Sequence, residues 1–380
     1  MKKVLLTIAS AFLAVVGFAQ LSGTYTVNGA QATGGTNYQT FSAAFSALTS
    51  QGVNGPVVFN CIQGTYTEQV YSYQQSISGT STTNTITFQA AASNTNEVLW
   101  TYSSYPIYWY NSNHNNITFD GLHFATTGSY NACIYLYRGL LTNITFENCE
   151  IDGPSTTSTS TTYSAFTAYY TSPQNLVLSN NTITGGSNGI CFYYSDYYNY
   201  TNTANVVLEN NSLTDFYYRG IYVYNYSSYK VKCEITGNSV TGGGYSYPYG
   251  IYAYYLDDGS LIEGNEVRVG GTSGGYAAYF YQAYGTSSNP VDIQNNIFEV
   301  TGNGPYTQYG MYCSYGYYTL IHHNTIIVNN SYTYSRAAYL YYSSSAYAGN
   351  EFKNNIVTAT QTGPYTVYGY WYTGAMTADN

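Results

Sequence analysis

The sequence contains very few charged residues. Asp, Glu, Lys and Arg make up 7% of its 380 residues, whereas ordinary soluble domains have about a quarter. Lys and Arg together number nine, against 18 Asp and Glu. A chain so poor in basic residues has no electrostatic footprint for nucleic acid or for anionic membranes, so we expect neither as a partner. Neutral polar groups must therefore keep the protein soluble.

Long apolar runs are also missing, except at the N-terminus. There two lysines precede an apolar stretch over residues 4–16, and small residues occupy the −3 and −1 positions before Gln20. This pattern predicts a signal peptide over residues 1–19 and a protein that is secreted or held at the cell surface. The stretch is too short to span a bilayer comfortably, so we expect no membrane insertion.

Paired-cysteine motifs are absent as well. The six cysteines show no CxxC spacing and fall at different places in the repeat described below. We therefore expect mostly free thiols that act as small buried apolar groups, with at most one chance disulfide. The cysteines are Cys61, Cys133, Cys149, Cys191, Cys233 and Cys313.

The sequence does contain an internal repeat. Nine eight-residue segments align without gaps, at intervals of 27 to 32 residues. Their first residues are Ile117, Ile144, Leu176, Val206, Cys233, Ser260, Val291, Thr319 and Asn350. The third and eighth positions are always apolar and the first usually is, whereas the second and fourth face outward, which is the two-residue period of a strand. A period of about 29 residues is typical of a solenoid.

The sixth position of the segment is Asn in seven of the nine repeats. Asn tolerates the left-handed backbone conformation that a sharp bend needs, and its amide can bond to an equivalent amide one coil away. The sequence therefore predicts an asparagine ladder at a corner of the solenoid. Its members are Asn181, Asn211, Asn238, Asn265, Asn296, Asn324 and Asn355.

A second strand recurs in each coil, and its outward positions are occupied by tyrosine. It reads IYVY from Ile221 and IYAY from Ile251, so that apolar residues alternate with tyrosines. Tyrosine is also the strongest anomaly of composition, with 52 residues. The predicted binding surface consists of Tyr135, Tyr137, Tyr193, Tyr222, Tyr224, Tyr252, Tyr254, Tyr279, Tyr281, Tyr312, Tyr339 and Tyr341.

These patterns predict an all-β fold, a single-stranded parallel β-helix whose equivalent strands pair between successive coils. Apolar residues at helical spacing within 40–50 predict an amphipathic helix that caps the N-terminal end. We expect the cap and first irregular coils over 20–110 and regular coils over 111–380. The last coil stops after one strand, as in a truncated piece, and its open edge would permit end-to-end self-association.

The capping helix, the PVVFN and GTYTEQV segments after it and the repeated NN-x-[IV] corners resemble the pectate-lyase-like right-handed β-helix superfamily. The closest resemblance is to large secreted surface proteins of type-IX-secreting bacteria. This fold carries lyases, hydrolases, phage tailspikes and adhesins alike, so the resemblance implies a fold and not an activity. The Gly-His-Gly and Arg-x-Lys motifs of hydrolases of this fold do not occur in this sequence.

Acidic residues at outward positions are the candidates for chemistry. Glu209, Glu234, Glu263 and Asp292 fall on four consecutive coils, with Lys232 as the nearby base. We expect neighbouring carboxylates about 5 Å apart, close enough to perturb one another or to share Ca²⁺. Asp120 and Glu147, on adjacent coils, could do the same. The alternative is that these charges only keep an exposed sheet soluble.

Other polar residues are weaker candidates for a functional site. His322 and His323 point to different sides with no carboxylate obvious beside them, so we expect no metal site there. Asp257 and Asp258 are expected in a loop. No cofactor is expected, with Ca²⁺ as the one option.

Three functions remain open. The first is binding of polysaccharide or cell-surface glycans by the tyrosine face, where rings stack on sugars and hydroxyls bond to them; the same ladder could equally be structural glue between coils. The second is a polysaccharide lyase or glycoside hydrolase that uses the carboxylates. The third is a stalk that displays another domain.

Overall fold

Each eight-residue segment forms two short strands that are joined at a corner. In the segment that begins at Leu176, the first four residues end strand β15 (Ser172–Ser179) and the last two lie in β16 (Thr182–Thr184). Leu176, Leu178 and Ile183 are fully buried. The tyrosine strand of the same coil follows as β17 (Asn188–Tyr193). A coil therefore has three strands, and its apolar positions point to the interior.

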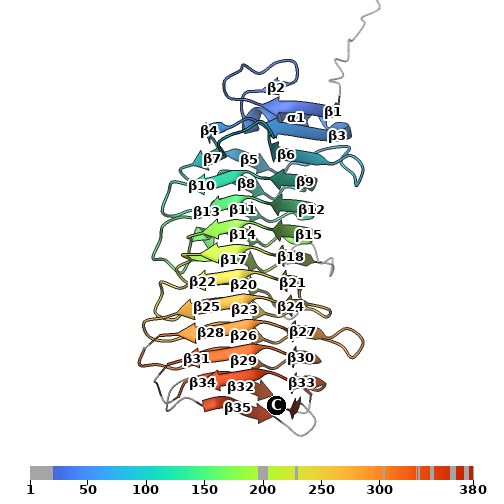
Figure 1. The fold of residues 1–380 in the computed structure, drawn as a ribbon. Helices are drawn as coiled ribbons and strands as arrows, with labels where there is room; N and C mark the ends of the chain where they lie inside the picture. The colour runs from blue at the N-terminus through green and yellow to red at the C-terminus, as the bar shows by residue number, and fades with distance from the viewer. Residues whose placement is uncertain are drawn as a thin grey trace, which may run out of the picture.

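The computed structural model describes residues 20–195, 204–226, 230–302, 304–330, 332, 334–342, 346–359, 365–371 and 376–379. The predicted signal peptide, 1–19, lies outside the described residues. Successive coils stack along one axis, from the N-terminal coils at the top of Figure 1 to the C-terminal coils at its bottom. All strand pairs between coils are parallel, so the predicted parallel β-helix is confirmed.

The first sheet contains 14 strands and carries positions one to four of the segment. In spatial order its strands are β2 (Asn37–Tyr38), β1 (Leu21–Val27), β3 (Val53–Cys61), β6 (Ile86–Ala90), β9 (Asn115–Asp120), β12 (Leu140–Glu147), β15, β18 (Asn205–Glu209), β21 (Lys232–Thr236), β24 (Leu261–Glu263), β27 (Val291–Gln294), β30 (Thr319–His322), β33 (Asn350–Lys353) and β36 (Met376–Asp379).

The second sheet contains 11 strands and carries positions seven and eight. Its strands are β4 (Gly64–Thr67), β7 (Val98–Tyr102), β10 (His123–Thr126), β13 (Glu150–Asp152), β16, β19 (Ser212–Thr214), β22 (Ser239–Gly242), β25 (Glu266–Gly270), β28 (Ile297–Thr301), β31 (Thr325–Asn329) and β34 (Ile356–Ala359).

The third sheet, which we call the tyrosine sheet, also contains 11 strands. They are β5 (Val70–Tyr73), β8 (Ile107–Tyr110), β11 (Ile134–Tyr137), β14 (Phe166–Tyr169), β17, β20 (Arg219–Tyr224), β23 (Tyr249–Tyr254), β26 (Gly275–Tyr281), β29 (Gln308–Ser314), β32 (Arg336–Tyr342) and β35 (Tyr365–Trp371). A single 3-10 turn, η1 (Thr161–Tyr163), lies between β13 and β14 among the described residues.

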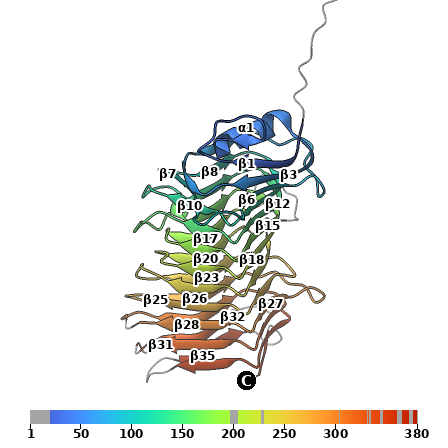
Figure 2. The same ribbon diagram turned by 45° about the horizontal axis from the view of Figure 1, so that its top comes forward.

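The predicted capping helix is confirmed as α1 (Phe41–Gln51), which lies across the N-terminal end of the rod in Figure 2. Phe41 stacks on Trp100 with ring centroids 4.0 Å apart, and Phe45 stacks on Phe88 at 5.5 Å. Both oxygens of the Glu68 carboxylate accept hydrogen bonds from backbone N–H groups of the first turn. Negative charge at a helix N-terminus is favourable, so Glu68 stabilises the cap where the chain enters the solenoid.

The core is a stack of equivalent apolar side chains. Phe59, Phe88, Phe119 and Phe146 occupy the same inward position on four adjacent coils, and their rings stack with centroids 4.5, 5.5 and 4.8 Å apart. All six cysteines are free and buried, so the one disulfide that the sequence left open does not form.

The asparagine ladder is confirmed, but its backbone differs from the prediction. None of its seven members has a positive φ; the left-handed residue is the one before, as in Asn180 (φ 56°), Asn210 (φ 54°) and Gly237 (φ 64°). The position-six side chains are buried instead. The Nδ2 of Asn211 donates to the Leu178 carbonyl and to Oδ1 of Asn238, at 2.8 and 3.0 Å. The fifth residue turns the chain, and the sixth ties the coils together.

Candidate binding surface and carboxylate clusters

The tyrosines of the tyrosine sheet form two columns in register. Tyr222 pairs with Tyr252, which pairs with Tyr279, while Tyr254 pairs with Tyr281 in the second column. The first column starts at Tyr71 and Tyr108, is interrupted at Thr167 and Cys191 after Tyr135, and continues through Tyr312 and Tyr339. The second starts at Tyr73 and Tyr110, continues through Tyr137, Tyr169, Tyr193 and Tyr224, and is interrupted at Ser314 before Tyr341. The outward alternation predicted from the sequence therefore places these rings side by side along the rod.

The rings stack on one another from coil to coil. Tyr279 lies 4.6 Å from Tyr252 and 4.8 Å from Tyr312, with interplanar angles of 17° and 11°. Tyr254 and Tyr281 stack at 4.6 Å and 8°. Because the stacking distance equals the spacing between coils, ring faces are covered by neighbouring rings and ring edges remain for contact with solvent. Where the rings lie face to face, as from Tyr252 to Tyr339, a sugar cannot stack on them, whereas Tyr222 and Tyr252 meet edge to face at 72°.

Two of the predicted surface tyrosines are almost fully covered. Tyr135 is 7% exposed and Tyr222 is 5% exposed. Tyr105 stacks on Tyr135 at 5.1 Å, and the guanidinium of Arg219 lies 4.0 Å from the ring centroid of Tyr222. The other predicted members are half-buried.

A third aromatic column escaped the sequence analysis. Tyr249, Tyr276 and Tyr309 pair in register and stack at 4.7 Å, with interplanar angles of 3° and 10°. Arg219 and Arg336 occupy the equivalent positions on the flanking coils. The sequence held the signal, since each of these residues stands two places before the first inward residue of its strand.

Burial makes these phenols weak acids. It raises the pKa of Tyr252 and of Tyr312 to about 12; Arg219 opposes the shift at Tyr252 and a Ser314 hydrogen bond opposes it at Tyr312, while neighbouring tyrosines add to it. Burial likewise raises the pKa of Tyr279 well above its usual range. The hydroxyls of Tyr252, Tyr279 and Tyr312 therefore stay protonated, as donors and acceptors, at any physiological pH.

The predicted strip of carboxylates does not assemble as a cluster. Glu209 pairs with Thr236, which separates it from Glu263, and Leu261 separates Glu234 from Asp292. The expectation of neighbouring carboxylates about 5 Å apart is wrong, because equivalents recur only on every second coil, about 10 Å apart. The acids alternate between positions two and four of the repeat, as the aligned segments already indicate.

Local partners neutralise much of this strip. Lys232 forms an ion pair with Glu234 at 3.0 Å, with both side chains more than 40% exposed. Glu263 accepts hydrogen bonds from the Gln294 and Asn295 amides at 3.2 and 3.1 Å. Burial raises the pKa of Asp292; His322 opposes the shift, and the carboxylate of Glu263 on the adjacent coil adds to it. Glu263 therefore perturbs Asp292 as predicted, whereas Glu234 is paired with a lysine.

Asp120 and Glu147 do lie opposite one another in adjacent strands. Asn148 donates a hydrogen bond to Asp120 at 2.8 Å, and burial together with the nearby Asp120 raises the pKa of Glu147. The pair is the like-charged contact that the sequence predicted, and it remains a candidate for Ca²⁺.

Two further expectations concern His322 and Asp257. A carboxylate does stand beside His322, because Oε2 of Glu351 lies 3.2 Å from its Nε2, contrary to the prediction. Glu351 lies on the next coil, 29 residues after His322 in the sequence, and it also forms an ion pair with Lys353 at 3.0 Å. Asp257 forms an ion pair with Lys230 at 2.8 Å.

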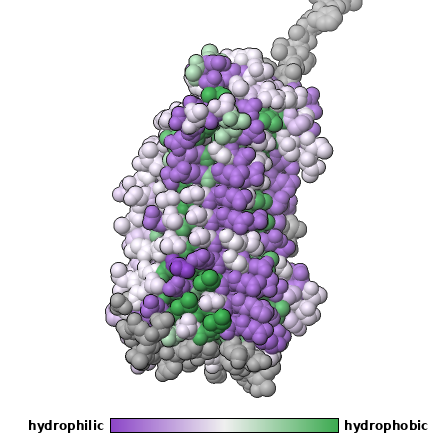
Figure 3. All heavy atoms as spheres, viewed as in Figure 1, coloured by the Kyte–Doolittle hydropathy of each residue, from purple (hydrophilic) through white to green (hydrophobic). Residues whose placement is uncertain are grey.

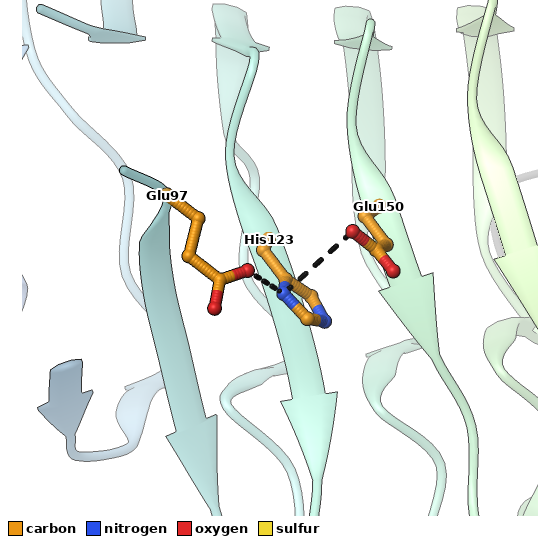
Figure 4. A group of neighbouring side chains, drawn as sticks. All are labelled: Glu97, His123 and Glu150. Atoms are coloured by element: carbon orange, nitrogen blue, oxygen red, sulfur yellow. Dashed lines mark hydrogen bonds and ion pairs between the residues drawn. The ribbon is translucent and has the colours of Figure 1, made fainter. Parts of the chain in front are cut away.

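A cluster around His123 was missed altogether. His123 begins β10, Glu150 begins β13 on the next coil, and Glu97 directly precedes β7 on the previous coil (Figure 4). Nδ1 of His123 lies 2.5 Å from Glu97 and 3.8 Å from Glu150, and its Nε2 lies 3.0 Å from Asp152. Burial alone would lower the pKa of His123, but the carboxylates of Asp152, Glu97 and Glu150 raise it to about 9.

A groove lies beside this cluster. Its volume is about 640 Å³, and its lining includes Asp152, Asp215 and Tyr217 together with several glycines. Elsewhere, hydrophobic residues form only narrow strips on the side of the rod seen in Figure 3. Among the residues that the structure describes, no helix is long and apolar enough to cross a membrane.

A family model and solved structures both match this chain. Similar solved structures include the Dettilon tailspike protein, with a TM-score of 0.47 and 13% identity over 91% of this chain and 68% of that one. Another is PfbA, a surface adhesin of Streptococcus pneumoniae, with a TM-score of 0.37 and 12% identity over 87% of this chain and 88% of that one. No curated protein sequence gives a significant match. A family described as "Right handed beta helix region" matches residues 48–267 and 168–377, and the chain therefore belongs to the right-handed β-helix family.

Proposed function

We propose that this protein is an extracellular rod that binds neutral polysaccharide along its tyrosine sheet. The observation that carries the proposal is the grid of phenols over adjacent coils. Tyr252, Tyr254, Tyr279 and Tyr281 form one unit of it, with rings 4.6 Å apart along the rod and 6.3 Å apart across it for Tyr279 and Tyr281. Each coil without an interruption adds another pair of phenol hydroxyls.

The mode of binding follows from the ring geometry. Stacked neighbours cover the ring faces, so a ligand would contact ring edges and hydroxyls. Each hydroxyl can donate and accept a hydrogen bond. Their spacing along the rod is close to the advance per sugar of an extended glycan chain. A polysaccharide that lies along the axis would therefore meet an equivalent hydroxyl at each residue, over several coils.

Electrostatics favour a neutral ligand. The formal net charge of the chain is −9, and basic residues are too few to attract an anionic polymer. Export is part of the same proposal, and its support is the signal peptide predicted over residues 1–19. The net charge and the predicted signal peptide are properties of this chain and do not rely on its similarity to the tailspike or the adhesin.

A polysaccharide lyase or glycoside hydrolase has less support. Such an enzyme needs convergent carboxylates or a base close to them, whereas the acids of the predicted strip alternate between coils and Lys232 is engaged by Glu234.

The test compares the double variant Tyr252→Phe/Tyr279→Phe with the parent in pull-down on insoluble cellulose and chitin and on pectate. We expect the parent to bind a neutral polymer and the variant to bind about tenfold more weakly, since each lost hydroxyl removes a hydrogen bond worth about 0.5–1.5 kcal/mol. The rings remain, so stacking between coils is preserved.

The matched control is Tyr25→Phe/Tyr38→Phe, a contacting pair outside the tyrosine sheet with ring centroids 5.8 Å apart. It should bind like the parent. A folded parent that retains none of these polymers would overturn the proposal, as would equal binding by the parent and the Tyr252/Tyr279 variant.

A further inference from the structure

Three consecutive coils each contribute one metal-ligating side chain to the same point on the second sheet. His123 and Glu150 are paired in register, and Glu97 stands two residues before Leu99, the partner of His123 on the other side. One donor atom from each of Glu97, His123 and Glu150 lies within 4.8 Å of the other two. Figure 4 shows both carboxylates turned toward the imidazole.

The imidazole is held so that a defined nitrogen meets the two glutamates. Nε2 of His123 lies 3.0 Å from Oδ2 of Asp152, two residues beyond Glu150 on β13. With Nε2–H donating to this carboxylate, Nδ1 is the nitrogen that lies between Glu97 and Glu150. A carboxylate behind the far nitrogen of a metal-bound imidazole is a recurrent arrangement, because it fixes the tautomer and the ring orientation.

The charge at this point is unbalanced. The ion pairs of Glu97, Glu150 and Asp152 in the described structure all go to His123. Elsewhere carboxylates such as Glu234 and Asp257 are each matched by a lysine. Three carboxylates around a single imidazole remain net negative even when the imidazole is protonated, so the cluster attracts a further positive charge.

We propose that Glu97, His123 and Glu150 form a binding site for a divalent transition-metal ion, for which Zn²⁺ is the best match. One imidazole nitrogen and two carboxylate oxygens suit Zn²⁺, whereas Ca²⁺ and Mg²⁺ prefer oxygen ligands alone. Three protein ligands leave a coordination position for water or an exogenous group. The ion would join three coils, because each ligand comes from a different one. This site is independent of the proposed glycan-binding surface.

The test is calorimetric titration of the untagged chain 20–380, stripped with chelator, with ZnCl₂ alone. We expect one equivalent to bind with micromolar or tighter affinity, and CaCl₂ in place of ZnCl₂ to give no comparable heat. His123→Ala should abolish the binding. The matched control is His322→Ala, which removes the other histidine that faces a glutamate and should leave the titration unchanged.

Glu150→Gln keeps the test valid if His123→Ala disturbs folding, because the Glu150 side chain is 50% exposed. It should weaken Zn²⁺ binding at least tenfold, and Glu351→Gln should not. Co²⁺ bound in place of Zn²⁺ should give visible absorption bands of a low-coordinate site that Glu150→Gln alters. A folded parent that binds no Zn²⁺, or Zn²⁺ binding that survives both His123→Ala and Glu150→Gln, would overturn the proposal.

Discussion

The rod contains two kinds of one-residue ladder, and they use their polar groups differently. In the asparagine ladder, Oδ1 of Asn211 accepts from the backbone N–H and the Nδ2 of Asn181, and its Nδ2 donates onward to the next coil and to a buried carbonyl. In the tyrosine columns, neighbours such as Tyr252 and Tyr279 contact one another through their rings.

This difference distinguishes side chains that only hold the coils together from side chains that could also contact a ligand. Six of the seven ladder asparagines are 1% exposed and Asn355 is 8% exposed, and their amides bond within the fold, so they are not placed to contact a ligand. The tyrosines use apolar ring faces for cohesion and leave their polar ends at the surface. One repeat thus stabilises the rod from within, while another can stabilise it and also bind.

The largest effect should come from Asn211→Ala. This change leaves a backbone N–H and an amide hydrogen of Asn181 and the Leu178 carbonyl without partners in a buried corner. Each such group costs about 1–3 kcal/mol, so we expect a loss of about 4 kcal/mol in the free energy of unfolding, measured by urea denaturation. A loss below about 1 kcal/mol would show that the ladder is not a principal tie between coils.

Tyr279→Ala should cost less. It removes a half-buried ring that stacks on Tyr252 and Tyr312, and lost burial and stacking together predict a loss of about 2 kcal/mol. Tyr279→Phe is the control and should change stability by less than about 0.5 kcal/mol. If the two variants were equally destabilised, the hydroxyl and not the ring would be the source of cohesion.

Alkaline pH should weaken the tyrosine columns but not the asparagine ladder. The folded-state pKa of Tyr252 and Tyr312 is about 12, whereas tyrosines of the unfolded chain ionise near pH 10. Between pH 10 and 12 the unfolded state has released protons that the folded state keeps, so stability falls as pH rises, by about 1 kcal/mol per pH unit for each such ring. Urea midpoints at pH 9, 10.5 and 11.5 would reveal the fall, and an unchanged midpoint would contradict it.

The smallest effect should come from Asn210→Ala, one residue before the ladder member Asn211. Asn210 is exposed and has a φ of 54°, so Ala would lose only the tolerance of Asn for the left-handed conformation. We expect a loss of about 1 kcal/mol in the same denaturation assay. The pair of neighbours therefore distinguishes a residue that turns the chain from one that binds the next coil.

Most of the fold could be predicted from the sequence, because every coil of a solenoid repeats the same pattern of buried and exposed residues. The apolar third and eighth positions and the asparagine column recur from coil to coil. The helix at Phe41 stands out by its different spacing. None of these needs knowledge of distant contacts. The left-handed residue of the corner was predicted at the sixth position but lies at the fifth, because either residue of an Asn-Asn pair suits a turn. Gly237 and Gly264 at the fifth position carried the information that distinguishes them.

The sites were harder to predict because they depend on which coils are neighbours. Glu209 and Glu263 look adjacent in a list of acids, but Thr236 lies between them in space. His123 and Glu150 share the seventh position of the segment, which holds no common residue type across the repeats, and Glu97 belongs to a coil outside the repeat. The covering of Tyr222 by Arg219 is a tertiary contact that outward alternation does not reveal.

The nearest-neighbour bonding of the asparagine ladder also bears on how such a protein can evolve. Each amide depends only on the coil before and the coil after, and equivalent asparagines are 27 to 31 residues apart. An in-frame duplication from one of these asparagines to the next would insert a whole coil whose amides find partners at once. Duplication or deletion of one coil would thus lengthen or shorten the rod in single steps. The number of phenol pairs along it would change accordingly.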